Sequence, residues 1–203
     1  MKIMFDVGCN NGNNSEYYVN NDYKVFAFEP TPKLCAELSE KFKNNSNFTL
    51  IKKAVSNVEG VMNFNVAGLS DWGCSSLLNF LPDLTINWGG RGDFKVTEII
   101  KVDVIRLDTF IKYNNILSID YLHCDAQGLD LSVLESLGQY INIVKKGTVE
   151  VANKRDVLYT NSNNYINDVV EFLEKNNFKI LDIKSNDGLN NESNVLFLNK
   201  CNI

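Results

Sequence analysis

The sequence lacks the features that mark a metal-binding, disulfide-rich or membrane protein. It has one histidine and five scattered cysteines without a C-x-x-C pair, so neither a zinc ribbon nor a disulfide framework is indicated. No apolar run approaches the ~18 residues of a membrane span. Asp6 and Gly8 interrupt the N-terminal segment before a signal-peptide core could form. We therefore expect a cytoplasmic protein with reduced, mostly buried thiols and no membrane span.

Positive charge is also scarce. The chain has 20 Lys and Arg against 25 Asp and Glu, a net charge of −5, and no run of basic residues. A nucleic-acid groove needs clustered Lys and Arg, so we expect no nucleic-acid partner. With 203 residues, 44% of them hydrophobic, the chain is long enough for a substantial core. It has no internal repeat or linker, so we expect one domain over residues 1–203.

Strand-like and helix-like segments alternate along most of the chain. Short apolar runs predict strands at Ile3–Val7, Lys24–Phe28, Phe48–Lys53, Ile119–Cys124 and Lys146–Val151, with helices between several of them. Two final strands, Phe178–Lys184 and Asn194–Asn199, flank a turn-rich segment and predict an antiparallel hairpin. This order predicts an α/β fold with a mostly parallel sheet. Residues 67–95 have no clear period, and we expect this long insertion to cover a substrate site.

A glycine-containing loop follows the first strand, and an acid ends the second. Gly8 and Gly12 allow close approach of a ligand to the backbone, and Asn10 and Asn11 tolerate positive φ. Because ligands bind at the carboxyl ends of parallel strands, Glu29 is placed to hold two ribose hydroxyls.

The loop differs from the dinucleotide fingerprint G-x-G-x-x-G, because asparagine stands where the later glycines belong. S-adenosylmethionine has no pyrophosphate and needs only its methionine carboxylate and ammonium held near the loop. Loop amides can bind that carboxylate, and Asp6 can attract the ammonium. The sequence therefore favours S-adenosylmethionine over NAD.

Further segments in a fixed order carry a family resemblance. They are Phe5-Asp6-Val7-Gly8-Cys9-Asn10-Asn11-Gly12, Phe28-Glu29-Pro30-Thr31-Pro32, Lys53-Ala54-Val55-Ser56-Asn57, Cys74-Ser75-Ser76-Leu77, Arg106-Leu107-Asp108-Thr109-Phe110-Ile111 and Asp125-Ala126-Gln127-Gly128-Leu129-Asp130. With them the sequence resembles the FkbM family of S-adenosylmethionine-dependent methyltransferases. The resemblance implies a Rossmann-like class I methyltransferase fold, with a mostly parallel seven-stranded sheet and an antiparallel last strand. It also implies O-methylation, typically of a sugar in a glycan or of a hydroxyl on a secondary metabolite.

The resemblance also implies site residues. The expected cofactor-binding set is Asp6, Gly8, Asn10, Asn11, Gly12, Ser15, Glu29, Pro30, Ala54 and Val55. Of these, Asp6, Gly8 and Gly12 would line the methionine end, Glu29 the ribose, and Ala54 and Val55 the adenine. Ser75 and Ser76 match a family motif and would approach substrate or cofactor. The sequence departs from the family at Gln127, where the family usually has glutamate.

Methyl transfer to a sugar hydroxyl calls for a base, because a neutral hydroxyl is a poor nucleophile. Asp125, after the fourth strand, is the first candidate, and an acid at the start of the next helix is the competing interpretation. His123, on the same strand, is the second candidate. Gln127 and Glu150 are further expected substrate contacts. Asp125, Glu150 and Asp130 could together hold Mg²⁺, but no ligand spacing identifies a metal site.

The insertion carries Trp72, Trp88 and Arg91, whose side chains suit sugar recognition. The competing interpretation is that the tryptophans only pack the insertion onto the domain. The expected acceptor is a sugar, glycan or other small hydroxylated compound, and a homodimer is possible. Two other functions remain open. One is an NAD-linked oxidoreductase or epimerase, which the altered glycine loop and the lack of a Tyr-x-x-x-Lys pair oppose. The other is a non-catalytic interaction module that binds a cofactor.

Overall fold

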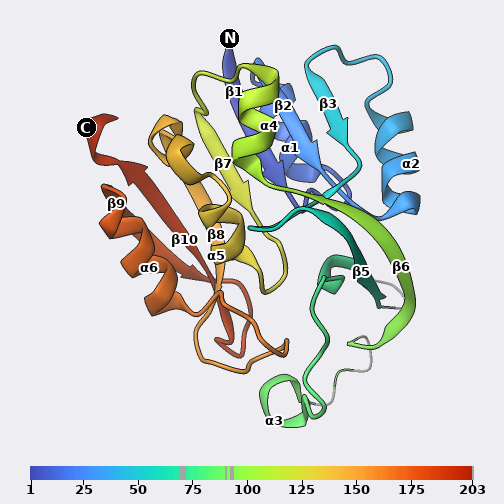
Figure 1. Ribbon diagram of the computed structural model, residues 1–203. Helices are drawn as coiled ribbons and strands as arrows, with labels where there is room; N and C mark the ends of the chain where they lie inside the picture. Colours follow the sequence, from blue (N-terminus) through green and yellow to red (C-terminus); the bar gives the residue numbers. More distant parts are fainter. Residues whose placement is uncertain (69–71, 90, 92–93, 203) are drawn as a thin grey trace.

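The computed structural model describes residues 1–68, 72–89, 91 and 94–202, with the side chains of all of these except Trp72 and Asn202. Its main feature is a seven-stranded sheet of order β3-β2-β1-β7-β8-β10-β9 (Figure 1). The strands are β1 (Lys2–Val7), β2 (Tyr23–Phe28), β3 (Phe48–Ile51), β7 (Tyr121–Cys124), β8 (Lys146–Ala152), β9 (Phe178–Ser185) and β10 (Glu192–Asn199). The first five strands of the order pair in parallel, and β10 is antiparallel to both β8 and β9. The predicted parallel sheet with a terminal hairpin is confirmed.

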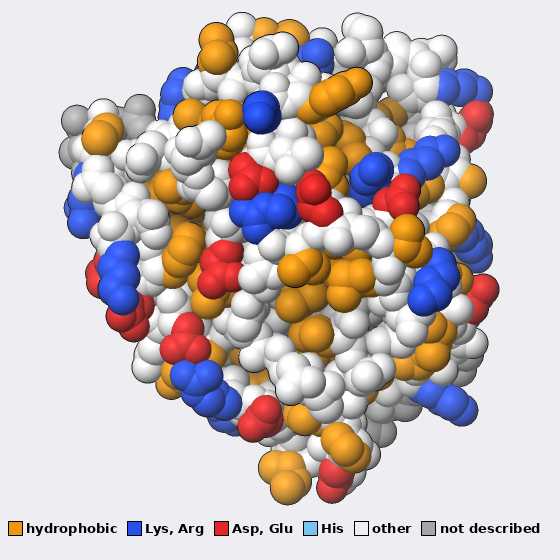
Figure 2. Space-filling model, in the orientation of Figure 1, with side chains coloured by type: hydrophobic (Ala, Val, Ile, Leu, Met, Phe, Trp, Pro, Cys, Tyr) orange, Lys and Arg blue, Asp and Glu red, His pale blue; other side chains and the backbone are white. Residues whose placement is uncertain are grey.

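Helices cover both faces of this sheet. The helices are α1 (Asn13–Val19), α2 (Pro32–Lys41), α4 (Leu107–Asn114), α5 (Asp130–Glu135) and α6 (Ile166–Lys175), with the 3-10 helix η2 (Gly138–Ile143) after α5. In Figure 1, α4, α5 and α6 lie in front of the sheet. On the face shown in Figure 2, acidic and basic side chains are interspersed, and no extended area of one sign is visible there.

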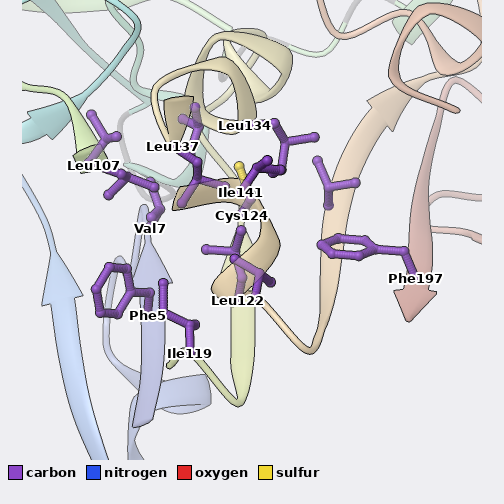
Figure 3. Packing of buried hydrophobic residues seen from close by; sticks show 14 of the residues in the cluster. Phe5, Val7, Leu107, Ile119, Leu122, Cys124, Leu134, Leu137, Ile141 and Phe197 are labelled. Atoms are coloured by element: carbon purple, nitrogen blue, oxygen red, sulfur yellow. The ribbon is translucent and has the colours of Figure 1, made fainter. Parts of the chain in front are cut away.

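The main core lies between the sheet and the helices α4, α5 and α6 (Figure 3). Successive side chains of a strand point to opposite faces, so Leu122 and Cys124 of β7 are fully buried in this core while Tyr121 and His123 lie on the other face. Phe5 of β1 packs edge-on against Phe110 of α4, with ring centroids 5.7 Å apart. This alternation decides which side chains at the end of each strand can reach a ligand.

A second, smaller sheet has the order β4-β6-β5 and consists of β4 (Ala54–Val55), β5 (Gly60–Ala67) and β6 (Val96–Ile105). The helix α3 (Thr85–Trp88) and the 3-10 helix η1 (Trp72–Cys74) lie in the insertion between β5 and β6. The strands β5 and β6 pair antiparallel. In Figure 1 the far end of this β5–β6 pair and the helix α3 lie below the large sheet, at the end opposite the N-terminus. The insertion therefore stands beside the carboxyl ends of the parallel strands, which is where a ligand binds in such sheets.

All five cysteines are described residues, and each is a free thiol; four are buried and Cys201 is exposed. Among the helices described, none is both long and apolar enough to cross a membrane.

Candidate active site

A pocket of about 540 Å³ lies at the carboxyl ends of β1, β2 and β7. Its lining includes Gly8, Asn10, Glu29, Pro30, Ala54, Val55, Ser75, Asp125 and Gln127 from the set singled out in the sequence. These residues come from five separate stretches of chain, and the sheet order brings them together. Phe64, Leu77 and Leu129 add apolar lining that the sequence analysis did not single out.

Gly8 allows the turn after β1 to touch the turn after β7. Its φ is +75°, and a Cβ built there would lie 1.9 Å from the backbone oxygen of Asp125. The Gly8 amide also donates to the carbonyl of Phe28 at 3.1 Å. Only glycine combines this φ with such close contact, so the base of the pocket depends on Gly8.

Gly12 lies where α1 packs against α2, and its expected place at the methionine end of the cofactor stays a prediction. Its φ is +74°, and a Cβ there would lie 2.6 Å from Leu38 Cδ2 and 2.9 Å from Phe42 Cε2. Gly12 therefore permits close packing of the start of α1 on α2, and the pocket lining does not include it. Asn11 is exposed and is likewise absent from that lining.

Glu29 is 4% exposed and lies in the pocket wall. Its Oε2 accepts from the Asn10 amide at 3.1 Å, and its Oε1 accepts from the Thr31 amide at 2.8 Å. Burial raises the pKa of the carboxyl group, and these hydrogen bonds oppose that rise. Each carboxylate oxygen has a second lone pair, so Glu29 can still accept from a hydroxyl in the pocket.

Asp6 is not in the pocket lining, and its carboxylate is held by two protein side chains; its expected contact with the cofactor stays a prediction. Its carboxylate is fully buried. One carboxylate oxygen accepts a hydrogen bond from Ser15 Oγ at 2.5 Å, and the other lies 2.9 Å from His123 Nδ1. His123 Nε2 in turn lies 3.1 Å from Asn14 Nδ2. Burial lowers the pKa of His123, but the hydrogen bond and charge of Asp6 outweigh it and raise that pKa. Asp6, Ser15 and His123 therefore tie β1, α1 and β7 together, and the structure does not bring His123 or Ser15 into the pocket.

The side chain of Gln127 connects several polar groups beyond the end of β7. Its Nε2 donates to Asp125 Oδ1 at 2.6 Å and to Glu150 Oε2 at 2.9 Å. The Tyr159 hydroxyl lies 2.7 Å from its Oε1. Glu150 itself is 6% exposed and lies behind Gln127, outside the pocket lining. Nothing in the sequence marked Tyr159, because it lies 32 residues from Gln127 in an irregular segment.

Asp130 is a structural residue. It is fully buried, and its carboxylate accepts from the amides of Ala126 at 2.7 Å and Gly128 at 3.2 Å. Burial is the main reason that its pKa rises to about 6, and the charge of Asp125 adds to the rise. Among the described residues, no three His, Cys, Asp or Glu side chains are grouped to hold a metal ion.

The insertion contributes both to the pocket and to its support. Ser75 lines the pocket and its Oγ accepts from the Ala67 amide at 3.0 Å. Ser76 is 1% exposed and donates to the Gln127 carbonyl at 2.7 Å, so it supports the pocket from behind.

Trp88 is a packing residue: it is 4% exposed and its Nε1 donates to the Val157 carbonyl at 3.0 Å. Arg91 is exposed, and its guanidinium lies 4.5 Å from the centre of the Phe94 ring, so the structure does not place it in the pocket. The side chain of Trp72 lies outside the described part of the chain.

Together, the strand order, the antiparallel β10 between β8 and β9, and a pocket at the carboxyl ends of β1 and β2 define a Rossmann-like class I methyltransferase fold. The chain belongs to the FkbM methyltransferase family, because the model of the methyltransferase FkbM domain matches residues 6–180.

Solved structures support the fold. A methyltransferase FkbM from Methylobacillus flagellatus KT is 13% identical with a TM-score of 0.62, and the match covers 97% of this chain and 43% of that one. Aeropyrum pernix fibrillarin, crystallised with natively bound S-adenosyl-L-methionine, is 10% identical with a TM-score of 0.50, covering 97% and 66%. TrmK of M. capricolum, crystallised with S-adenosyl-homocysteine, is 14% identical with a TM-score of 0.50, covering 98% and 62%. The present chain thus spans less than two thirds of the length of each of these proteins. No curated protein matches the sequence at a significant level.

Proposed function

We propose that this chain is an S-adenosylmethionine-dependent O-methyltransferase that acts on a hydroxyl of a sugar or of another small, neutral, hydroxylated acceptor. The observation that carries the proposal is that two acids, Glu29 and Asp125, line the same pocket. In our proposal Glu29 accepts from the ribose hydroxyls and Asp125 receives the acceptor proton. A homodimer and a cytoplasmic location remain predictions.

The residues of the pocket fit the proposed cofactor. Glu29 is held by two backbone amides and would accept from the ribose hydroxyls. Ala54, Val55 and Phe64 offer an apolar wall for a flat base. Gly8 and Asn10, in the loop after β1, also line the pocket and would lie toward the methionine end of the cofactor.

When bound, S-adenosylmethionine supplies a methyl group on a sulfonium, whose carbon–sulfur bond breaks with its electron pair going to sulfur. The chain's task is to align the acceptor oxygen and to receive its proton. Asp125 is the residue we assign to that proton, because its carboxylate lines the pocket and its Oδ1 is already oriented by Gln127.

A small acceptor is favoured over a nucleic acid by charge. The net charge is −5, and acidic and basic groups are interspersed on the face in Figure 2. Binding to a phosphate backbone depends on several clustered Lys and Arg contacts. Although fibrillarin is a structural neighbour, a likeness of 10% identity describes the fold and carries no acceptor with it.

Calorimetry tests the cofactor first. The purified chain is titrated with S-adenosylmethionine, S-adenosylhomocysteine and NAD, alongside Glu29→Ala. We expect micromolar binding of the first two ligands, weakened at least tenfold in the variant, and no binding of NAD. Glu40→Ala, on the exposed surface of α2, is the matched control and should bind as the wild type does. Failure of the folded wild type to bind either methyl donor or product would refute the proposal, and tight NAD binding would revive the oxidoreductase.

Methyl transfer is then measured with radiolabelled S-adenosylmethionine and a panel of neutral sugars and glycosides. With an acceptor in hand, Asp125→Asn should lower kcat by about 10²–10⁴-fold, the usual contribution of a general base. Asp182→Asn, on the exposed strand β9, should leave kcat unchanged. Full activity of Asp125→Asn would remove Asp125 from the reaction.

A further inference from the structure

The amide of Gln127 lies between two carboxyl groups. One nitrogen, Nε2, donates to Asp125 at 2.6 Å and to Glu150 at 2.9 Å, so both of its hydrogens are used. The opposite end, Oε1, faces the Tyr159 hydroxyl at 2.7 Å, which also lies 2.8 Å from the Cys74 carbonyl. Since carboxylates only accept and the hydroxyl can donate, this surrounding fixes which end of the amide faces which group.

Gln127 also holds an uncommon backbone conformation. Its φ is +49°, in the left-handed region that residues other than glycine, asparagine and aspartate rarely adopt. Ser76 Oγ donates to the Gln127 carbonyl at 2.7 Å and is itself 1% exposed. Such conformations persist where the surroundings over-determine them, and they gather at functional sites. The insertion therefore supports the backbone of Gln127 in this conformation, from which its side chain reaches both acids.

The charges around this group are mostly negative. Burial, first, and then the charge of Asp125 raise the pKa of Glu150 well above its usual range. Glu192 on β10 adds a further acid, and Asp130 on α5 adds another, while Arg91 is the cation that acts on Glu192.

Two other titratable groups complete these surroundings. The Tyr159 phenol is buried, and burial raises its pKa, so it stays neutral and donates. His123 of β7 bonds Asp6 on the other face of the sheet. Acids this close cannot all ionise, so one proton is expected to be shared between the nearest pair.

We propose that Gln127 is a positioning residue that holds the Asp125 and Glu150 carboxyl groups as a hydrogen-bonded pair, with one proton shared by the pair. The inference rests on the proposed function in one respect, namely that Asp125 receives the acceptor proton. As the bond from methyl carbon to acceptor oxygen forms, the hydroxyl proton passes to the charged Asp125 carboxylate and later to solvent. A neutral amide at position 127 donates to both carboxyl groups, whereas an ionised acid there would donate to neither and would repel both.

Carbon-13 NMR of labelled Asp and Glu carboxyl groups tests this in the ligand-free protein. Asp125→Asn and Glu150→Gln identify the two signals. We expect the Asp125 and Glu150 carboxyl groups together to hold one proton at pH 7 in the wild type. In Gln127→Glu, we expect the three carboxyl groups to bind about one additional proton at pH 7. Gln139→Glu, on the exposed start of η2, makes the same change of charge away from the pair and should leave both signals unmoved.

Two milder variants guard against loss of the fold. Tyr159→Phe removes the hydroxyl that orients the amide, and Gln127→Met keeps the side-chain volume without the amide. In each we expect the titration of the pair to move upward, because the hydrogen bonds from the amide to the two carboxyl groups are weakened or lost. Titration of Glu150 like an exposed glutamate, near ~4.3, would overturn the proposal, as would unchanged titrations in Gln127→Met. The experiment uses neither cofactor nor acceptor, so failure of methyl-donor binding would count against the proposed function alone.

Discussion

The contact between the turns after β1 and β7 makes a stability prediction for Gly8→Ala. The new methyl group must move from 1.9 Å to at least 3.0 Å from the backbone oxygen of Asp125, and no side chain can rotate to make room. A left-handed alanine costs about 1–2 kcal/mol, and overpacking against a fixed neighbour adds up to about 3 kcal/mol. We therefore expect Gly8→Ala to lose about 2–5 kcal/mol of unfolding free energy.

Gly89→Ala is the matched control, because Gly89 has a φ of +61° and an added Cβ would meet nothing within 4 Å. It should lose only the backbone cost of about 1–2 kcal/mol. Urea denaturation of both variants measures the difference. Thermal melting should follow, at about 2–4 °C per kcal/mol for a chain of this size. If Gly8→Ala unfolds within about 0.5 kcal/mol of Gly89→Ala, well inside the added cost, the turns do not touch as described.

Three further predictions concern pH and packing. Burial raises the pKa of Glu192 to about 8. The free energy of unfolding should therefore fall as pH rises from about 4.5 to 8, by at most about 5 kcal/mol. Glu192→Gln should flatten this part of the plot of urea midpoint against pH, and an unchanged slope would contradict the assignment. Asp6 raises the pKa of His123. The ion pair therefore stabilises the folded chain fully below about pH 6.5, and this stabilisation is lost as pH rises through the pKa of His123 in the folded state. His123→Gln should remove this pH-dependent loss, which is followed by the urea midpoint from pH 6 to 9. Trp88→Ala should cost about 3–5 kcal/mol of local stability. The loss should be measured as faster amide hydrogen exchange over residues 153–165. Unchanged exchange there would show that Trp88 does not anchor this segment through Val157.

Local sequence patterns sufficed for most of the architecture. Apolar runs and their spacing predicted the parallel strands and the final hairpin, because side-chain periodicity is a property of neighbouring residues. The helix α4 was missed, since it has only eight residues and three buried positions, Leu107, Phe110 and Ile111, which is too short for a periodic signal. The two-residue strand β4 was missed for the same reason.

The first half of the pocket also follows from the sequence. Gly8 and Glu29 each stand directly after a strand, and parallel strands end at one edge, so their meeting in one pocket was predictable. Ala54 and Val55 were placed through the family resemblance, and the structure puts them in the same lining. These positions needed only the order of elements along the chain.

Only the tertiary structure decided the partners of the buried polar groups. Asp6 is an acid beside a glycine loop, which is compatible with cofactor binding, yet it bonds His123, 117 residues away. Gln127 looked like a loss relative to the family, and the fold places it between Asp125 and a glutamate 23 residues further on, Glu150. A sequence states which groups are polar and which strand they follow. Which of them meet depends on strand order and on how loops pack, and a buried hydrogen bond is decided by contacts that no local pattern encodes.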